Sequence, residues 1–159
     1  EIGLAETGWK IIGNPEEAKH HPKSVVDGQF SMPFCAAVVL REGGMVWDDY
    51  AKHINDANTL ELCKKVNVSI DQRVEDLAPD LMSGTVRIKT KAGEYETLIK
   101  VALGEPENFM SEKQFRGKFD GLCAPYLGQE KSGKLANALM HIEEANSLRS
   151  VMELSQPNA

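Results

Sequence analysis

The most concentrated group of basic side chains in the sequence is His20-His21 followed by Lys23. An imidazole titrates near neutrality, so either histidine could serve as an acid, a base or an anion ligand, and the lysine would add a positive charge. Adjacent histidines in a polar loop are more often simply solvated, and no third ligand is spaced nearby to complete a metal site. His20, His21 and Lys23 are therefore candidates for binding an anionic substrate, with simple solvation as the alternative, and we predict no metal centre.

A second candidate for anion binding is the start of an apolar helix, where Gln29 and Ser31 precede a run of apolar residues that reaches Leu40. Backbone N–H groups at a helix start are unpaired and favour an anionic group such as a carboxylate. In the alternative, Ser31 only caps the helix and Gln29 only ties down the preceding loop. The sequence leaves both interpretations open, and substrate contact by Gln29 and Ser31 is a hypothesis.

Other groupings that could support chemistry are absent or badly placed. The acidic pairs Asp48-Asp49 and Glu143-Glu144 lie on helix faces that we predict to be wet, whereas paired carboxylates need a desolvated cleft for acid–base work. The sequence contains no glycine-rich phosphate loop, no Ser-His-Asp arrangement and no cysteine cluster. We therefore expect no cofactor, since neither a nucleotide, a metal nor a flavin is indicated.

Composition and charge exclude several classes of function. The 159 residues carry a formal net charge of −6, and an acidic surface repels phosphate backbones, so nucleic-acid binding is not expected. The longest apolar stretch, residues 32–40, is too short to span a bilayer, so no membrane association is expected. Cys35, Cys63 and Cys123 are widely separated, which favours free thiols in a reducing compartment and hence a cytoplasmic protein.

The hydrophobic pattern predicts a small sheet packed by helices. Residues 85–91 and 95–101 alternate apolar and polar side chains around an Ala92-Gly93 turn, which is typical of a β-hairpin with one wet face and therefore of an antiparallel sheet. Helix-capping residues, Gly and Pro residues that end elements, and apolar residues at helical spacing predict the bounds of the remaining elements. We expect strands at residues 1–12 and 66–70, a polar loop at 15–23, and helices at 31–40, 47–54, 60–66, 111–125, 129–146 and 147–154.

The order of these elements is that of an α+β fold. The helix at residues 31–40 has hardly a polar side chain and should be buried on all sides. Ser111 and Gln114 form a capping box that starts the C-terminal helices. We predict two domains: an α+β domain over residues 1–110, and C-terminal helices over residues 111–159 that would pack on a further helical domain or on the first.

A family resemblance is carried by residues 22–34, which read PKSVVDGQFSMPF. They resemble the motif P-x-[ST]-V-V-D-[AG]-Q-F-S-[ILM]-P-[FY], which opens a buried helix in the MmgE/PrpD family of 2-methylcitrate dehydratases, cis-aconitate decarboxylases and iminodisuccinate epimerases. Residues 8–15, 84–93, 103–111 and Lys118-Phe119 resemble further blocks of that family. Their joint order makes nearly the whole chain similar to the C-terminal part of the family.

The resemblance implies a large helical domain completed by a smaller α+β lid, with the active site in the cleft between them. It implies that the catalytic histidines and lysines lie on the helical domain or on a P-x-C-x-x-T-H-like stretch, which this sequence does not contain. The catalytic residues are therefore unknown here and are expected upstream of Glu1. Phe34 stands where the decarboxylases have a substrate-facing tyrosine; it either lines the cleft or belongs to the core, and it has no acidic hydroxyl to donate.

The resulting prediction is the C-terminal lid of a cofactor-independent lyase that dehydrates 2-methylcitrate or a close hydroxy-polycarboxylate in propionate metabolism, and that is inactive without its N-terminal helical domain. The implied partners are a small polycarboxylate substrate, that helical domain and, for the full enzyme, a second copy in a homodimer. The alternatives are a non-catalytic ligand- or partner-binding α+β module, or an isomerase, epimerase or decarboxylase of the same family. An uncovered apolar patch on residues 129–154, or on the side of the apolar helix, would indicate a lid rather than an independent module.

Overall fold

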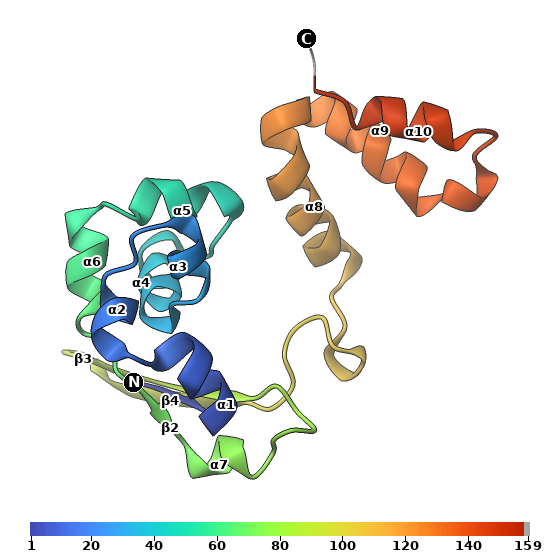
Figure 1. The fold of residues 1–159 in the computed structure, drawn as a ribbon. Helices are drawn as coiled ribbons and strands as arrows, with labels where there is room; N and C mark the ends of the chain where they lie inside the picture. The colour runs from blue at the N-terminus through green and yellow to red at the C-terminus, as the bar shows by residue number, and fades with distance from the viewer. Residues whose placement is uncertain (158–159) are drawn as a thin grey trace. The chain divides into compact units, whose positions relative to one another are not determined.

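The computed structural model describes residues 1–157, which form two compact units. The first unit, Glu1–Phe109, combines a four-stranded sheet with a layer of short helices (Figure 1). The second unit begins at Met110 and is helical as far as it is described. This architecture confirms the α+β class that the sequence predicts.

The sheet of the first unit is mixed. Its strands are β1, Ile2–Leu4; β2, Val68–Ile70; β3, Gly84–Thr90; and β4, Gly93–Ile99. They lie in the order β2-β1-β3-β4, so β4 forms one edge. β3 and β4 make the predicted hairpin, and β1 is antiparallel to β3. β1 and β2 are parallel, which corrects the prediction of an antiparallel sheet; the long helical connection between them allows the chain to return in the same direction.

The N-terminal segment is less extended than its sequence pattern predicts. Strand β1 is followed by helix α1, Glu6–Gly8, and by the π-helical turn η1, Trp9–Gly13. The predicted loop at residues 15–23 contains helix α2, Glu16–His20, and helix α3, Val25–Gln29, follows it. Helices this short have too few turns for a helical period of apolar residues to be recognised in the sequence.

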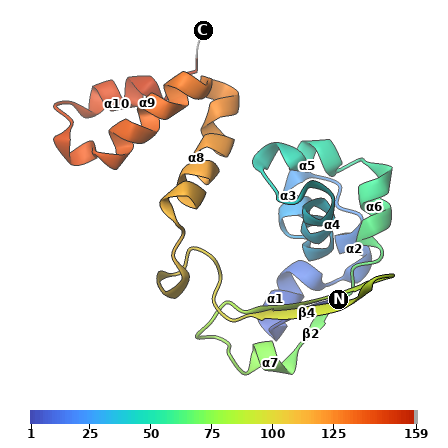
Figure 2. The same ribbon diagram turned by 180° about the vertical axis from the view of Figure 1, so that it is seen from behind.

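Helix α4, Met32–Glu42, is flanked by α2 and α3 and by the two helices that follow it in the chain, in both views of the ribbon (Figures 1 and 2). Ser31 caps its start, and Gly43 ends it with a φ of 77°, a left-handed conformation that glycine adopts without strain. The prediction of burial on all sides is wrong for the last full turn, because Val39 and Leu40 are exposed.

Two apolar cores hold the first unit together. Phe34, Ala37 and Val38 of α4 are fully buried against Cys63, in a layer completed by helices α5 and α6. The second core lies between the sheet and the helices, where Ile2, Leu4 and Val66 pack with partly buried side chains that include Trp9, Met32 and Val68. The remaining helical bounds are α5, Trp47–His53; α6, Ala57–Cys63; α7, Gln72–Glu75; and the 3-10 turn η2, Pro106–Asn108.

The second unit is built from helices α8, Glu112–Leu127; α9, Gln129–Met140; and α10, Leu148–Leu154, with the 3-10 turn η3, Ile142–Glu144. The predicted capping box starts α8: Ser111 Oγ accepts from Gln114 N, and the Gln114 side chain accepts from Ser111 N. Leu127, Leu135 and Val151 form its core. Because α8 and α10 each give residues to this core, the unit has an apolar centre of its own.

Candidate functional site

A pocket of about 640 Å³ opens at the corner that helices α2 and α3 form in the first unit. Its volume falls in the range of small-molecule sites in proteins, roughly 300–1,000 Å³. The lining combines apolar, cationic and acidic side chains: Pro15, Glu17, Ala18, Lys19, His21, Lys23, Val26, Asp27 and Phe30. The pocket therefore brings together two of the predicted site residues, His21 and Lys23.

Local capping interactions shape this pocket. Ser24 caps α3 by accepting from Asp27 N at 3.1 Å, and the Asp27 carboxylate accepts in turn from Lys23 N at 3.0 Å. Lys19 Nζ donates to Ile11 O at 2.6 Å, which fixes this ammonium group at the rim. The charges of Asp27 and Lys19 are thus engaged with backbone groups, and they hold the two helices in place.

The side chains of His21 and Lys23 are exposed and make no hydrogen bond or ion pair within the described part of the chain. The charge of His21 acts at longer range on Glu61. The hydrogen bond from Lys64 is the main cause that lowers the pKa of Glu61, and the charge of His21 is the smallest. Both the imidazole and the ammonium group are therefore available to a solute in the pocket.

The other four predicted residues lie elsewhere. His20 Nε2 lies 3.0 Å from Val66 O, so this half-buried ring links α2 to the segment before β2. Gln29 is exposed at the end of α3 and does not line the pocket. Ser31 is buried, accepts from Phe34 N at 3.1 Å and donates to Lys19 O at 2.5 Å. Phe34 has no exposed surface and stacks on Tyr50, with ring centroids 6.1 Å apart.

Sequence reasoning predicted only His21 and Lys23 and missed the other seven lining residues of the pocket, which are Pro15, Glu17, Ala18, Lys19, Val26, Asp27 and Phe30. The signal was present in part, because Val26 and Phe30 are spaced four residues apart and so share one face of a helix. It went unrecognised because this segment precedes the apolar run and was not expected to be helical.

Residues 1–143 match the family model of the MmgE/PrpD C-terminal domain. The chain belongs to the MmgE/PrpD family. The match covers the whole first unit, and in the second it covers α8 and α9 and ends within η3. No curated protein sequence matches this MmgE/PrpD chain. None of its helices over residues 1–157 is both long and apolar enough to cross a membrane.

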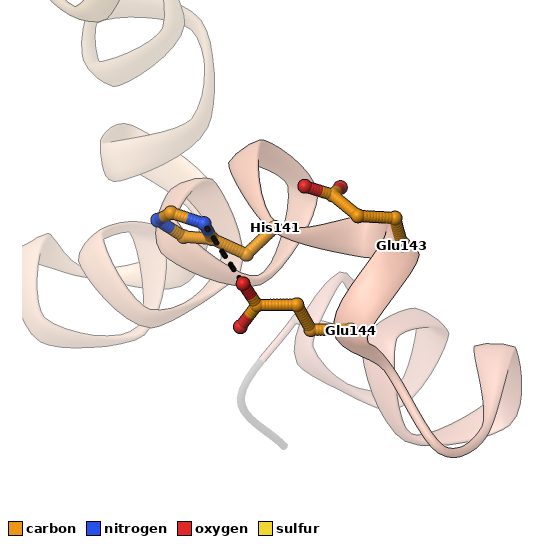
Figure 3. Close-up of side chains that lie close together, drawn as sticks. All are labelled: His141, Glu143 and Glu144. Atoms are coloured by element: carbon orange, nitrogen blue, oxygen red, sulfur yellow. Dashed lines mark ion pairs between the residues drawn. The ribbon is translucent and has the colours of Figure 1, made fainter.

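The MmgE/PrpD chain also places His141, Glu143 and Glu144 close together around η3 (Figure 3). Their candidate ligand atoms all lie within 4.8 Å of one another, and His141 Nδ1 is 4.0 Å from Glu144 Oε1. All three side chains are exposed, as predicted for the acidic pair, and no other described side chain holds them in position. Ligands of a built metal site are normally oriented by further hydrogen bonds, so we do not assign a metal to this cluster.

A partly buried polar cluster in the MmgE/PrpD chain has a structural role. His53 is almost fully buried: its Nδ1 lies 2.8 Å from Thr59 Oγ1, and its Nε2 lies 3.0 Å from Glu42 Oε1 without hydrogen-bond geometry. Arg41 pairs with Asp56 and Thr59. Hydrogen bonds from Thr59 N and Oγ1, and then from Arg41, lower the pKa of Asp56 to about 2. The cluster joins the ends of α4, α5 and α6.

Proposed function

We propose that this chain is the lid portion of a cofactor-independent MmgE/PrpD lyase and that it functions together with an N-terminal helical domain. The name of the matched domain, a C-terminal domain, implies an N-terminal partner domain in proteins of the family. The observation that carries the proposal is that each of the two units, taken by itself, leaves apolar surface uncovered.

Helix α8 supplies this surface in the second unit. Phe119 and Cys123 pack on the apolar core, whereas Phe115, Leu122 and Tyr126 are 53%, 44% and 58% exposed. The exposed three are separated by seven and four residues, so they form one stripe along the helix. Further exposed apolar side chains of this unit are Leu139, Met140, Ile142, Leu148 and Met152. A monomeric protein rarely leaves so many apolar groups in water unless another protein surface covers them.

Helix α4 supplies the surface in the first unit. Val39 and Leu40 on its last full turn are exposed, as are Val46 and Trp47 at the start of α5. This is the side of the apolar helix on which the sequence predicted an uncovered patch for a separated lid. The exposure of this side favours the interpretation as a lid. An independent binding module would need to cover its own apolar residues.

The reaction proposed for the complete enzyme is dehydration of 2-methylcitrate or a close hydroxy-polycarboxylate. A base on the N-terminal domain removes the proton alpha to a carboxylate, and the electron pair of that bond forms the double bond as the bond from carbon to the hydroxyl oxygen breaks. The departing hydroxide takes up a proton and leaves as water. The lid would exclude solvent and position the substrate. Of the residues in this chain, His21 and Lys23 are the proposed contacts to a carboxylate because both line the pocket, whereas Phe34 and Ser31 are buried in the core.

A dehydration assay tests this proposal. The chain is assayed on 2-methylcitrate alone, and then with the N-terminal domain that the proposal requires, supplied as a separate polypeptide. We expect association of the two chains and activity only in the mixture. Activity of this chain alone would contradict the assignment of the catalytic groups to the N-terminal domain. Association without dehydration would favour an epimerase or decarboxylase, and failure to associate would favour a separate binding module.

A further inference from the structure

We propose that the pocket between α2 and α3 is a binding site, complete within this chain, for one carboxylate together with an adjacent alkyl group. The inference deepens the proposed function, on which it rests for the identity of the natural ligand: the site would receive one end of an alkyl-substituted polycarboxylate. All of its lining comes from residues 15–30, so binding requires no other domain.

The polar side of the pocket fits a single carboxylate. Lys23 and His21 present a cation and an imidazole with no described hydrogen bond or ion pair, and Lys19 adds a positive charge that its bond to Ile11 O holds in place. Glu17 and Asp27 also line the pocket, and their negative charges oppose a ligand with several anionic groups at this point. The balance of these charges favours one carboxylate over a polyphosphate or a tricarboxylate held entirely inside.

The apolar side of the pocket fits an alkyl group. Val26 of α3 and Phe30, the C-cap residue of the same helix, both line the pocket, and they are 60% and 49% exposed although they are apolar. Pro15 and Ala18 add further apolar surface. A methyl group that leaves water for such a surface gains binding free energy in proportion to the area buried. The pocket should therefore prefer a branched carboxylate to its unbranched counterpart.

Titration of the whole chain with 2-methylsuccinate and with succinate tests the inference, with amide chemical shifts of residues 15–30 as the readout. We expect the methylated acid to bind about fourfold more tightly, the gain expected for one buried methyl group. Lys23→Gln should weaken both acids by about threefold, as for a solvent-exposed ion pair. Val26→Ser should abolish the preference for the methylated acid and leave succinate binding unchanged. All the changed side chains are exposed, so the fold should persist.

Lys91→Gln, on the turn between β3 and β4, is the matched control because it removes an exposed lysine outside the pocket. Equal affinity for the two acids, an effect of Lys91→Gln as large as that of Lys23→Gln, or shifts outside residues 15–30 would each overturn the inference. So would the absence of binding. The dehydration assay with the N-terminal domain is scored separately, so a failed titration beside a working assay removes only this inference and not the lid function.

Discussion

Thr85 and Asp71 are joined across a glycine: Thr85 Oγ1 donates to Asp71 Oδ2 at 2.9 Å, directly over Gly3 of β1. A Cβ at Gly3 would lie 2.2 Å from Thr85 Oγ1 and 2.5 Å from Asp71 Cβ, so only glycine leaves room for this contact. Arg73 binds the same carboxylate at 2.7 Å and also pairs with Glu96 of β4 at 2.7 Å. The polar face of the sheet is therefore bridged from the end of β2 to β4.

Gly3→Ala should destabilise the first unit. Because the added methyl group would have to displace Thr85 or Asp71, we expect a loss of about 1–3 kcal/mol in the free energy of unfolding, as for other overpacked sites. Urea denaturation measures it. Gly44→Ala is the matched control, since a Cβ there meets nothing within 4 Å and should change stability little. Equal effects of the two substitutions would contradict the close contact at Gly3.

Acid should weaken the link between α4 and α6. Hydrogen bonds from Thr59 and Arg41 hold the folded-state pKa of Asp56 at about 2, below its ordinary value of 3.8. A carboxyl group whose pKa is depressed by folding stabilises the protein above its unfolded-state pKa, and this stabilisation is lost as the pH falls toward the folded-state value. The midpoint temperature of thermal unfolding should therefore decrease as the pH is lowered from about 4 to about 2.

Asp56→Asn separates this contribution from those of other carboxylates. The variant should have a lower midpoint at neutral pH, because an amide replaces the charged partner of Arg41, and a smaller further decrease in acid. A decrease in acid equal to that of the unchanged protein would show that Asp56 does not contribute. Asp48→Asn is a suitable control, since Asp48 is exposed on α5 and lies outside this cluster.

Phe34→Tyr should lower stability and give no gain in activity. The ring is fully buried beside Tyr50, so the added hydroxyl would lose its hydration; an unsatisfied buried hydroxyl costs about 1–3 kcal/mol. Phe30→Tyr places the same hydroxyl on an exposed ring and should be nearly neutral. If Phe34→Tyr is neutral in denaturation and raises activity in the mixed assay, then residue 34 faces the substrate rather than the core.

Charging the apolar stripe of α8 should prevent association with the N-terminal domain. We expect Leu122→Asp with Tyr126→Asp to abolish copurification of the two chains and to reduce binding of a hydrophobic dye. Both side chains are exposed in this unit, so circular dichroism should show an unchanged helical content. The control is Lys113→Asp with Lys118→Asp, also two exposed positions of α8, which should leave copurification intact. Retained association of the double Leu122 and Tyr126 variant would place the docking surface elsewhere.

The sequence predicted the elements whose signals are local. The hairpin follows from strict alternation, and the capping box at Ser111 and Gln114 fixes the start of α8. Helices α2 and α3 were missed because five residues make little more than one helical turn. The parallel pairing of β1 and β2 was missed because it results from a connection through several helices, and a local sequence pattern does not encode strand direction. The exposure of Val39 depends on which neighbours are present, which the apolar pattern of one helix does not encode.

Of the candidate site, only the two basic residues His21 and Lys23 could be predicted from the sequence. His21 and Lys23 stood out as a basic pair and share the pocket, but His20, directly before His21 in the sequence, contacts Val66 O instead. Helix α2 ends at His20 and His21 leaves the helical conformation with φ −131° and ψ 61°, so residues that are adjacent in the sequence are separated by the fold. Val26 and Phe30 form apolar lining of the pocket, and their position there depends on helix α3, which the sequence pattern did not predict.

The open edge of β4 has a practical consequence for handling this protein. Its outer backbone groups pair with no described strand, and Tyr95 and Ile99 beside them are exposed, which makes the edge a template for fibril growth. Glu94 and Glu96 of this strand pair with Arg87, Lys89 and Arg73, and we expect the loss of these ion pairs in acid and high salt to loosen the hairpin and free its edge. Concentrated stocks in acidic, high-salt buffer should therefore develop thioflavin fluorescence, whereas stocks near neutral pH and low salt should stay clear; a shelf life independent of pH would show that the glutamates have no such protective role.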